Sequence, residues 1–569
     1  FLGVDKSKGG YEDVLVITDH FTRYAQAVPC RNQNAHTTAK ALYEHWNVKF
    51  KILMDSVEKF AREWAKREHA ALDSLSEWIK SIRSIILKRI RSLKGKMKSK
   101  NKSIFLDPEV KSTLESLHEK YVIVPADKAS NNLILVCRHY YISCIQKELG
   151  LLDTRGNPTY TLSNLPKDDI LANHASVLQS FRLPINDKDT DLPCLYWIPK
   201  LHKNPYKQRF ISGSSNCSTK PLSKLLTTIL ATIKSGLQSY CDTVYSRSGI
   251  NGMWILKNSK ELLSNLEHPL LKNISSIRTF DFSTLYTTIP HSKLKERLRS
   301  LVMRAFFSKK GERRYKYMVV NYTGSYFVKN TSNSKKKYTE EEIIKMINFL
   351  VDNIYVEFGG KIFQQTIGIP MGTNCAPLLA DLFLFSYEAE FVEELVKSGH
   401  RDLAKAFNFT FRYIDDVLSL NNKKFIDYVH RIYPSELEIK DTTDSSTSAA
   451  YLDIFLRRNQ QGQLFTKLYD KRDDFNFPIV NFPFMESNIP ASPTYGVYMS
   501  QLIRYSRACS QYHDFRARCR LLTDKLTTQG FERCRLMKIM GKFYGRHSDL
   551  IGKYSVSLCN MKSDVFDAC

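Results

Sequence analysis

The sequence of 569 residues is poor in acidic residues and lacks both long apolar runs and paired cysteines. No stretch of about 18 apolar residues occurs, so no membrane-spanning helix can be read. The twelve cysteines form no Cys-x-x-Cys pair, which argues against a structural zinc module or a disulfide framework and favours a reducing compartment. No GxxxxGK[ST] phosphate-binding loop is present, so the pattern does not indicate an NTPase motor.

The chain is rich in basic residues and has enough hydrophobic residues to form folded cores. Lys and Arg number 84 against 58 Asp and Glu, a formal net charge of +26, so a polyanion such as nucleic acid is the first candidate partner. A generic basic protein is the alternative. Hydrophobic content of 43% and aromatic content of 12% exclude a disordered tail protein. At roughly 100–200 residues per domain, the length predicts about three to five folded units.

Two features bear on where the protein works. A helical pattern from about Ser56 ends in a run, Lys80 to Lys102, that holds ten basic residues and no acidic one. The run fits either a solvated helix face with a basic linker, or a segment that contacts phosphates or directs nuclear import. The chain opens at Phe1 without a charged-then-apolar leader, so we expect a piece of a longer reading frame that is not secreted. A nuclear location is expected, or else a cytoplasmic one.

The first 45 residues have a character of their own. An apolar run at 14–19 predicts a strand, and 24–28 is a candidate partner strand. The segment KSKGGYEDVLVITDHFTRYAQAVP resembles the start of the integrase catalytic core of gypsy-like long-terminal-repeat retroelements. Neither Asp5 nor Asp19 matches a catalytic position of that family. We therefore expect an inactive, truncated α/β remnant.

Further along the chain, helices are expected to alternate with short strands. Residues 121–125 and 133–137 are two predicted strands. Residues 304–342 look like a basic, polar insertion that closes with a helix start at Thr339, since three glutamates follow in the first turn. Residues 493–546 are predicted to be mainly helical, with 11 Lys and Arg against 3 acidic residues.

Two adjacent carboxylates give the strongest chemical signal. Asp415 and Asp416 are flanked on both sides by apolar or aromatic residues, which predicts a hairpin with both acids at its turn. Adjacent like charges in an apolar setting raise each other's pKa and resist desolvation. A divalent cation removes that penalty, and two ions about 3.5–4 Å apart are usual in in-line phosphoryl transfer. A simple surface turn is the alternative.

Two further blocks strengthen the metal interpretation. Asp281 follows an aromatic residue at the expected end of a strand, and a second aromatic, Tyr286, comes five residues later. Three carboxylates on two strand ends suffice for two Mg²⁺ ions. Between the acidic blocks lies the segment 368–377, whose glycines allow the backbone to approach a ligand closely.

In this order, the three blocks resemble motifs A, B and C of a reverse transcriptase palm. The residues of 126–136 (ADKASNNLILV) and the pair Met371-Gly372 most resemble the corresponding segments of Penelope-like retroelements, whose reverse transcriptases are related to telomerase. The resemblance covers roughly residues 105–545. Its other matching segments are 196–205 and 209–212 as fingers, 450–453 as a primer grip, and 466–467.

The resemblance implies an α+β right-hand polymerase with fingers, a palm built on an antiparallel sheet, and a helical thumb. The expected order is an integrase-like remnant at 1–45, a basic helical linker at 46–104, an N-terminal extension with fingers at 105–270, a palm at 271–460 with an insertion at 304–342, a thumb or helix-turn-helix-like region at 461–550, and a tail at 551–569.

The same resemblance assigns the catalytic roles. Asp281 and Asp415 would carry two Mg²⁺ ions, with Mn²⁺ as a possible substitute, helped by the backbone carbonyl of Phe282. Asp416 would coordinate weakly. Tyr286 stands at the family's steric-gate position, where an aromatic ring excludes a ribose 2′-hydroxyl; plain core packing is its alternative role.

Nucleotide and nucleic-acid contacts are also implied. Lys200 and Arg209 would clamp the triphosphate, and Arg can bond two oxygens at once. Gly372 would let the backbone lie against the template–primer pair, and Met371, where many retroviral relatives carry Gln, would bind the nucleotide together with it. The residues expected to contact nucleic acid are Lys203, Lys467, Arg504, Arg507 and Arg516. An ordinary amphipathic bundle with solvated arginines is the alternative for the last helices.

The sequence thus predicts an RNA-directed DNA polymerase of a retroelement. Its partners would be an RNA template, a DNA primer and dNTPs, with no membrane. One rival is a catalytically silent nucleic-acid-binding relic of a decayed element. A second rival is an RNA-templated RNA polymerase, which Tyr286 disfavours.

Overall fold

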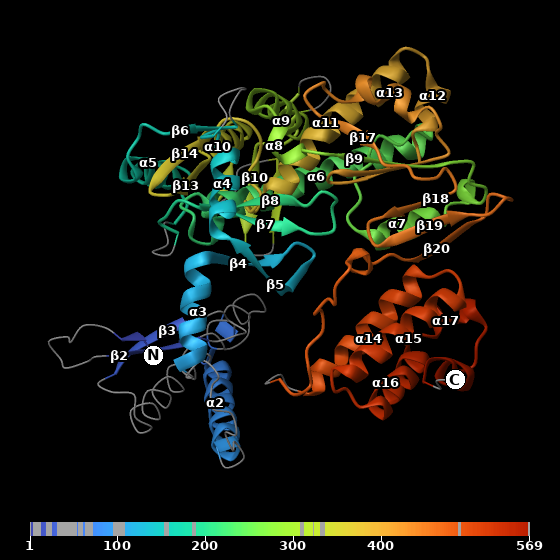
Figure 1. The fold of residues 1–569 in the computed structure, drawn as a ribbon. Coiled ribbons are helices and arrows are strands. Elements are labelled where there is room, and N and C mark those ends of the chain that lie inside the picture. Colours follow the sequence, from blue (N-terminus) through green and yellow to red (C-terminus); the bar gives the residue numbers. More distant parts are fainter. Residues whose placement is uncertain are drawn as a thin grey trace. The chain divides into compact units, whose positions relative to one another are not determined.

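The computed structural model describes residues 2–3, 13–18, 25–30, 54, 58, 61–62, 72–94, 108–152, 159–184, 189–307, 312–321, 324–329, 336–487 and 491–566. The chain divides into two compact units, 1–120 and 121–569 (Figure 1). In the first unit, β1 (Leu2–Gly3), β2 (Asp13–Thr18) and β3 (Ala25–Cys30) form an antiparallel sheet. The expected pairing of the first two apolar runs is confirmed by the β2–β3 ladder.

Helices complete what the structure describes of the first unit. They are α2 (Leu72–Lys94) and α3 (Pro108–Lys120). On α2, the apolar face contributes buried Leu75 and Ile79, which cluster with Met54 and Ala61. The far end of the basic run, 95–102, lies outside the described residues.

The second unit opens with a hairpin and a five-stranded sheet. The hairpin is β4 (Tyr121–Ala126) with β5 (Ala129–Cys137), which confirms both strands expected there. The sheet has the order β6 (Tyr160–Leu162), β14 (Lys361–Gln365), β13 (Tyr355–Phe358), β7 (Cys194–Lys200) and β8 (Lys207–Gly213). The helices of this part are α4 (Arg138–Glu148), α5 (Lys167–Ser180) and α6 (Lys220–Ser248).

A four-stranded antiparallel sheet, here called the carboxylate sheet, follows. Its order is β15 (Thr410–Tyr413), β16 (Asp416–Leu420), β9 (Ile277–Phe282) and β17 (Ile439–Asp441). The helices around it are α7 (Ser259–Leu266), α8 (Leu285–Thr288), α9 (His291–Phe306), α10 (Glu340–Asp352), α11 (Ala376–Lys397), α12 (Arg401–Ala406) and α13 (Phe425–Ile432). Helix α11 is apolar almost all round, and it is buried in the largest hydrophobic core. The mixed α+β fold expected from the sequence is confirmed.

The segment predicted as a polar insertion contributes to the core. It forms β10 (Tyr317–Asn321), β11 (Gly324–Val328) and β12 (Lys337–Tyr338), three strands that the sequence analysis did not foresee. Met318 and Tyr338 are fully buried there. The helix start at Thr339 is confirmed, because its side chain accepts from the Glu342 N–H and the Glu342 side chain bonds back in a capping box.

The chain ends in a small sheet and a helical bundle (Figure 1). The sheet comprises β18 (Ser448–Tyr451), β19 (Ile454–Arg458) and β20 (Leu464–Leu468). The bundle comprises α14 (Ala491–Ala508), α15 (Tyr512–Thr528), α16 (Arg533–Arg546), α17 (Ser548–Ile551) and α18 (Leu558–Phe566), which confirms the expected helical region. No helix in the described ranges combines the length and apolarity needed to cross a bilayer.

Candidate active site

Three carboxylates meet at one end of the carboxylate sheet. Asp281 lies on β9 directly opposite Asp416 at the start of β16, and Asp415 occupies the turn between β15 and β16. The Phe282 N–H donates to the Asp415 carbonyl at 3.1 Å, which ties the turn to the neighbouring strand. Directly opposite residues in an antiparallel pair project from the same face, so Asp281 and Asp416 share one side of the sheet. The expected hairpin and strand end are both confirmed.

Burial and mutual repulsion raise the free-energy cost of ionising these acids. Burial, followed by the charge of Asp415, raises the pKa of Asp416 to about 6. Burial also raises the pKa of Asp415, and the charge of Asp281 adds to that effect. Opposite charges within a few ångströms would relieve this cost, so the site favours a cationic ligand.

The donors at this site suit a hard divalent cation. Within the described ranges, no three His, Cys, Asp or Glu side chains form a preformed metal cluster. The set implied by the resemblance needs only two side chains, Asp281 and Asp415, plus the Phe282 carbonyl. Mg²⁺ accepts such an incomplete set because it commonly takes its remaining ligands from water and substrate phosphates. The residues therefore fit Mg²⁺ by donor chemistry.

Cationic side chains face the carboxylates from the β7–β8 hairpin. Lys200 ends β7, and burial followed by the Arg209 charge lowers its pKa. Arg209, on β8, is ion-paired with Asp127, with Nε 3.2 Å from Oδ1 and Nη2 3.3 Å from Oδ2. Asp127 itself is 7% exposed and is fixed by its N–H, which donates to the Pro199 carbonyl at 2.9 Å. The charge of Arg209 also lowers the pKa of Asp415, so the expected triphosphate-binding pair lies within electrostatic reach of that carboxylate.

Sequence reasoning missed three charged residues of this site. Asp127 and Lys128 stand at the β4–β5 turn, and Lys471 follows β20. The positive charges of Lys471 and Lys128 both lower the pKa of Asp416, which places them within electrostatic reach of it. Asp127 and Lys128 lie in the segment ADKASNNLILV, which carries part of the family resemblance. A charged Asp-Lys turn between two apolar strands is the sequence signal that could have indicated both residues.

The glycine-rich segment packs tightly against β8. The Ser212 N–H donates to the Met371 carbonyl at 2.9 Å, and the Ser214 hydroxyl donates to the Gly372 carbonyl at 2.5 Å. Gly372 has a φ of +124°, and a Cβ there would lie 2.2 Å from the Ser212 carbonyl oxygen. Only glycine fits this contact, which fixes the loop beside the hairpin that carries Arg209.

Tyr286 lies on α8, directly after the Asp281 strand, and is partly buried. Its carbonyl accepts from the Ile369 N–H at 2.6 Å, so the glycine-rich segment and α8 are locked together. Burial, followed by the charge of Asp415, raises the pKa of the Tyr286 hydroxyl, which keeps the ring neutral. The Tyr286 hydroxyl therefore lies within electrostatic reach of the Asp415 carboxylate.

The β18–β20 sheet supports the carboxylate turn from another side. The Tyr451 hydroxyl is 3.2 Å from the carbonyls of both Phe411 and Asp416, and one hydroxyl hydrogen serves the two. Asp453, the last residue of the expected primer grip, is ion-paired with Arg504 at 2.9 Å. Lys467 is exposed, with its Nζ 5.0 Å from the centre of the Phe455 ring.

The arginines of the terminal helices are mostly engaged within the chain. Arg504 pairs with Asp453, and Arg516 lies 3.5 Å from Asp564 on α18. The others with internal acidic or carbonyl partners are Arg518 with Asp473, Arg520 with the Asp564 carbonyl, Arg533 with the Phe566 carbonyl and Arg535 with Glu532. Arg507 and Lys203 are exposed. The alternation of arginine with aromatic residues therefore reflects bundle packing as well as any external contact.

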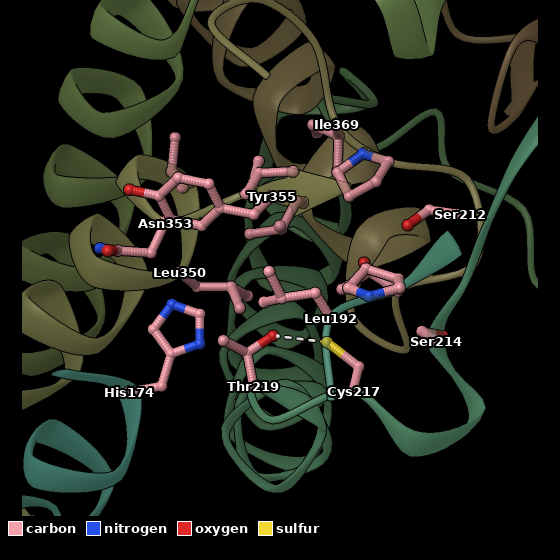
Figure 2. Close-up of a pocket in the computed structure, with 16 residues that line it drawn as sticks. His174, Leu192, Ser212, Ser214, Cys217, Thr219, Leu350, Asn353, Tyr355 and Ile369 are labelled. Carbon is pink, nitrogen blue, oxygen red and sulfur yellow. Dashed lines mark hydrogen bonds between the residues drawn. The ribbon is translucent and has the colours of Figure 1, made fainter. Parts of the chain in front are cut away.

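A small cavity of about 30 Å³ lies behind the glycine-rich segment (Figure 2). Its lining includes Ile369 and Thr373 of that segment and His174 of α5. The His174 ring is 1% exposed, and its Nδ1 lies 2.8 Å from the Ser218 hydroxyl. Its Nε2 is buried without a hydrogen-bond partner among the described residues. A space of this size holds one or two water molecules.

The burial of His174 predicts a specific loss of stability in acid. Desolvation lowers its pKa to about 4, below the unfolded value of about 6.5. Because the unfolded state binds the proton more tightly, stability falls as the pH drops from about 6.5 toward 4, by up to about 3 kcal/mol. Urea unfolding of wild type and His174→Gln at pH 8 and pH 4.5 checks this. At pH 4.5 the free energy of unfolding of His174→Gln should be higher, relative to that of wild type, than at pH 8. The same difference between the two proteins at both pH values would contradict the prediction.

Comparison with known proteins gives likeness of fold only. No family model matches the chain, and no curated protein matches it. Among solved structures, the chain is similar to telomerase from Candida albicans in complex with the TWJ fragment of telomeric RNA, at 12% identity and a TM-score of 0.49, over 80% of this chain and 72% of that one. It is also similar to apo telomerase from Candida tropicalis (11%, TM-score 0.41, 77% and 71%) and to the Sicinivirus 3Dpol RNA-dependent RNA polymerase (11%, 0.33, 70% and 74%).

Proposed function

We propose that this chain is an RNA-directed DNA polymerase that transfers a nucleotidyl group from a dNTP to a primer 3′-hydroxyl. The observation that carries the proposal is the meeting of Asp281, Asp415 and Asp416 at one sheet end, next to the Lys200 and Arg209 cations. Carboxylates that gather a divalent cation beside a phosphate-binding arginine are the minimal equipment for this reaction.

The residues divide the chemistry between them. Asp281, Asp415 and the Phe282 carbonyl would hold Mg²⁺ or Mn²⁺, with Asp416 contributing weakly. The bound metal supplies charge neutralisation of the phosphates and lowers the pKa of the primer hydroxyl. Lys200 and Arg209 bind the triphosphate. The 3′-oxygen would bond to the α-phosphorus and give its proton to water, while the bond from the α-phosphorus to the pyrophosphate leaving group breaks.

Other residues serve the nucleic acid. The backbone at Gly372 lies against the template–primer pair, and Met371 beside it contacts the nucleotide. The exposed Lys203, Lys467 and Arg507 contact the phosphate backbone. Such contacts are sequence-independent and weaken with salt. Arg504 and Arg516 are already ion-paired, so they reach a phosphate only by exchanging an acidic partner. The excess of 26 positive charges is consistent with a long polyanionic ligand.

The finer assignment rests on sequence resemblance. We infer a Penelope-like retroelement as the source, an inactive gypsy-type integrase remnant at 1–45 and a helix-turn-helix-like module among the terminal helices. The basic run at 80–102 supports a nuclear location. These inferences leave the catalytic proposal unchanged if they fail.

The proposal is tested by primer extension with the full chain on poly(rA)/oligo(dT), dTTP and Mg²⁺ or Mn²⁺. Extension supports a polymerase. Primer–template binding without extension under either metal would instead identify the catalytically silent relic. Ribonucleotide addition at the same rate as deoxynucleotide addition would identify an RNA-templated RNA polymerase.

The role of Tyr286 makes a separate prediction. Replacing it by Val is expected to lower the preference for dTTP over UTP by about 100-fold, because the ring that excludes the 2′-hydroxyl is removed. Single-nucleotide incorporation kinetics with each substrate measure the ratio. Tyr286→Phe keeps the ring and should keep the preference. Equal ratios in Val, Phe and wild type would leave Tyr286 with core packing only.

A further inference from the structure

A buried ion network lies directly behind the carboxylate turn. The side chains of Arg412 and Glu388 are 0% exposed, and Asp381 is 9% exposed. Arg412 stands on β15, and both acids stand on α11. No role for any of the three follows from the local sequence pattern.

All five N–H groups of Arg412 find acceptors. Nε and Nη2 donate to the two Glu388 carboxylate oxygens at 2.5 and 3.2 Å. Nη1 donates to Asp381 Oδ1, and Nη2 donates to the Asp381 carbonyl, both at 3.0 Å. The remaining bond runs from Nη1 to the carbonyl of Ile414 at 3.1 Å. The guanidinium thus links α11 to the turn that carries Asp415.

Ile414 has an unusual backbone conformation. Its φ is +55°, in the left-handed region that a β-branched residue rarely adopts. Such a conformation is strained and persists only where the surroundings hold it. The carbonyl that Arg412 binds belongs to this strained residue, which directly precedes Asp415.

The network reaches the second catalytic strand as well. Glu388 Oε1 accepts from the Tyr433 hydroxyl at 2.8 Å, and the Tyr433 ring packs edge-on against Phe282 with centroids 4.9 Å apart. Phe282 directly follows Asp281. One buried acid therefore connects Arg412, next to the turn that carries Asp415, with the strand that carries Asp281.

Charge balance argues for a positional role. Lys234 Nζ donates to Asp381 Oδ2 at 2.7 Å, so two cations neutralise two carboxylates. Buried ion pairs often contribute no more stability than well-packed apolar side chains of the same size. Their benefit here is geometric, since five directed bonds fix one guanidinium.

We propose that Arg412 is a positioning residue that holds the left-handed Ile414 so that Asp415 faces Asp281. The inference rests on the proposed polymerase function. Lysine at this position keeps the charge, yet three rotatable N–H groups cannot replace five fixed ones. The turn would then relax, and Asp415 would leave its position.

The test compares three variants for kcat, KM and amide hydrogen exchange of the peptide spanning 413–417. Arg412→Lys should lower kcat at least about 100-fold with the KM for dNTP nearly unchanged, and should raise exchange at the turn at least about 10-fold. Adding Ile414→Gly should recover at least about 10-fold in kcat, because glycine adopts positive φ without support. Lys234→Met, which disturbs the same network without touching Ile414, should leave kcat and exchange at the turn close to wild type.

The possible outcomes separate the two claims. Unchanged exchange at the turn in Arg412→Lys would overturn the inference, whether or not the protein extends primers. So would equal effects of Lys234→Met, or no recovery on adding glycine at 414, since both indicate a network that only stabilises the fold. A wild-type protein that extends no primer refutes the polymerase function, and hydrogen exchange still decides whether Arg412 holds the turn.

Discussion

Replacing Asp415 by Asn should lower the rate of primer extension by at least about 10³-fold without unfolding the protein. The substitution removes one charge of the pair proposed to hold the metal, and each tenfold loss of rate equals about 1.4 kcal/mol of transition-state stabilisation. Single-turnover incorporation of one dNTP measures the effect. Asp441→Asn is the matched control: this acid lies on β17 of the same sheet and pairs with Arg278, away from the turn.

Loss of a carboxylate at the same site should raise the stability of the protein. The pKa of Asp416 is raised to about 6, above its unfolded value of about 3.8, so its ionised form opposes folding at every pH above about 6. Asp416→Asn should therefore raise the free energy of unfolding at pH 8 by on the order of 1–2 kcal/mol, as measured by urea unfolding. A variant that is both destabilised and fully active would contradict a site shaped for a cation.

Replacing Gly372 by Ala should be the second most damaging change, with extension reduced at least about 100-fold. The new Cβ would lie 2.2 Å from the Ser212 carbonyl oxygen, and φ of +124° already excludes most side chains. The loop must move away from β8, and Met371 moves with it. Steady-state kinetics with dTTP on an RNA template report the loss.

Gly360→Ala provides the control for backbone strain alone. Gly360 also has positive φ, +74°, but a Cβ there meets nothing within 4 Å. We expect a stability loss of about 1 kcal/mol and extension within about twofold of wild type. Equal activity of the two alanine variants would show that the contact with Ser212 is unimportant for the reaction.

Local pattern was sufficient for the strands that carry the carboxylates. Apolar residues on both sides of Asp415 and Asp416 predicted the β15–β16 hairpin, and the aromatic flanks of Asp281 predicted the end of β9. The capping glutamates predicted the start of α10 at Thr339. Each of these features depends on residues within a few positions of one another, which is the range that periodicity reports.

Hydrogen-bond and ion-pair partners that are distant in the sequence lie beyond the range of such local patterns. Arg412 lies three residues before Asp415, yet its acceptors on α11 lie 24 and 31 residues away in the sequence. The pairing of Asp127 with Arg209 spans 82 residues. The terminal arginines alternate with aromatic residues whether they face a phosphate or an acid such as Asp564, so spacing alone does not tell the two apart.

The insertion at 304–342 shows a related limit. Its basic, polar ends suggested a surface addition, but the middle folds as β10 and β11 and hydrogen-bonds to α6 through Ser325 and Thr232 at 2.6 Å. Composition averaged over the segment concealed Met318 and Val319, which reach the core. Which residues of a strand are buried is set by what the strand packs against, which composition does not record.

Single-nucleotide addition to a DNA primer on an RNA template tests the central claim most directly. With Mg²⁺ and the complementary dNTP, the full chain should extend the primer by one residue and release one pyrophosphate per addition. It should prefer the deoxynucleotide over the ribonucleotide by at least about 100-fold. Binding of the primer–template without any addition, under Mg²⁺ and Mn²⁺ alike, would contradict the account.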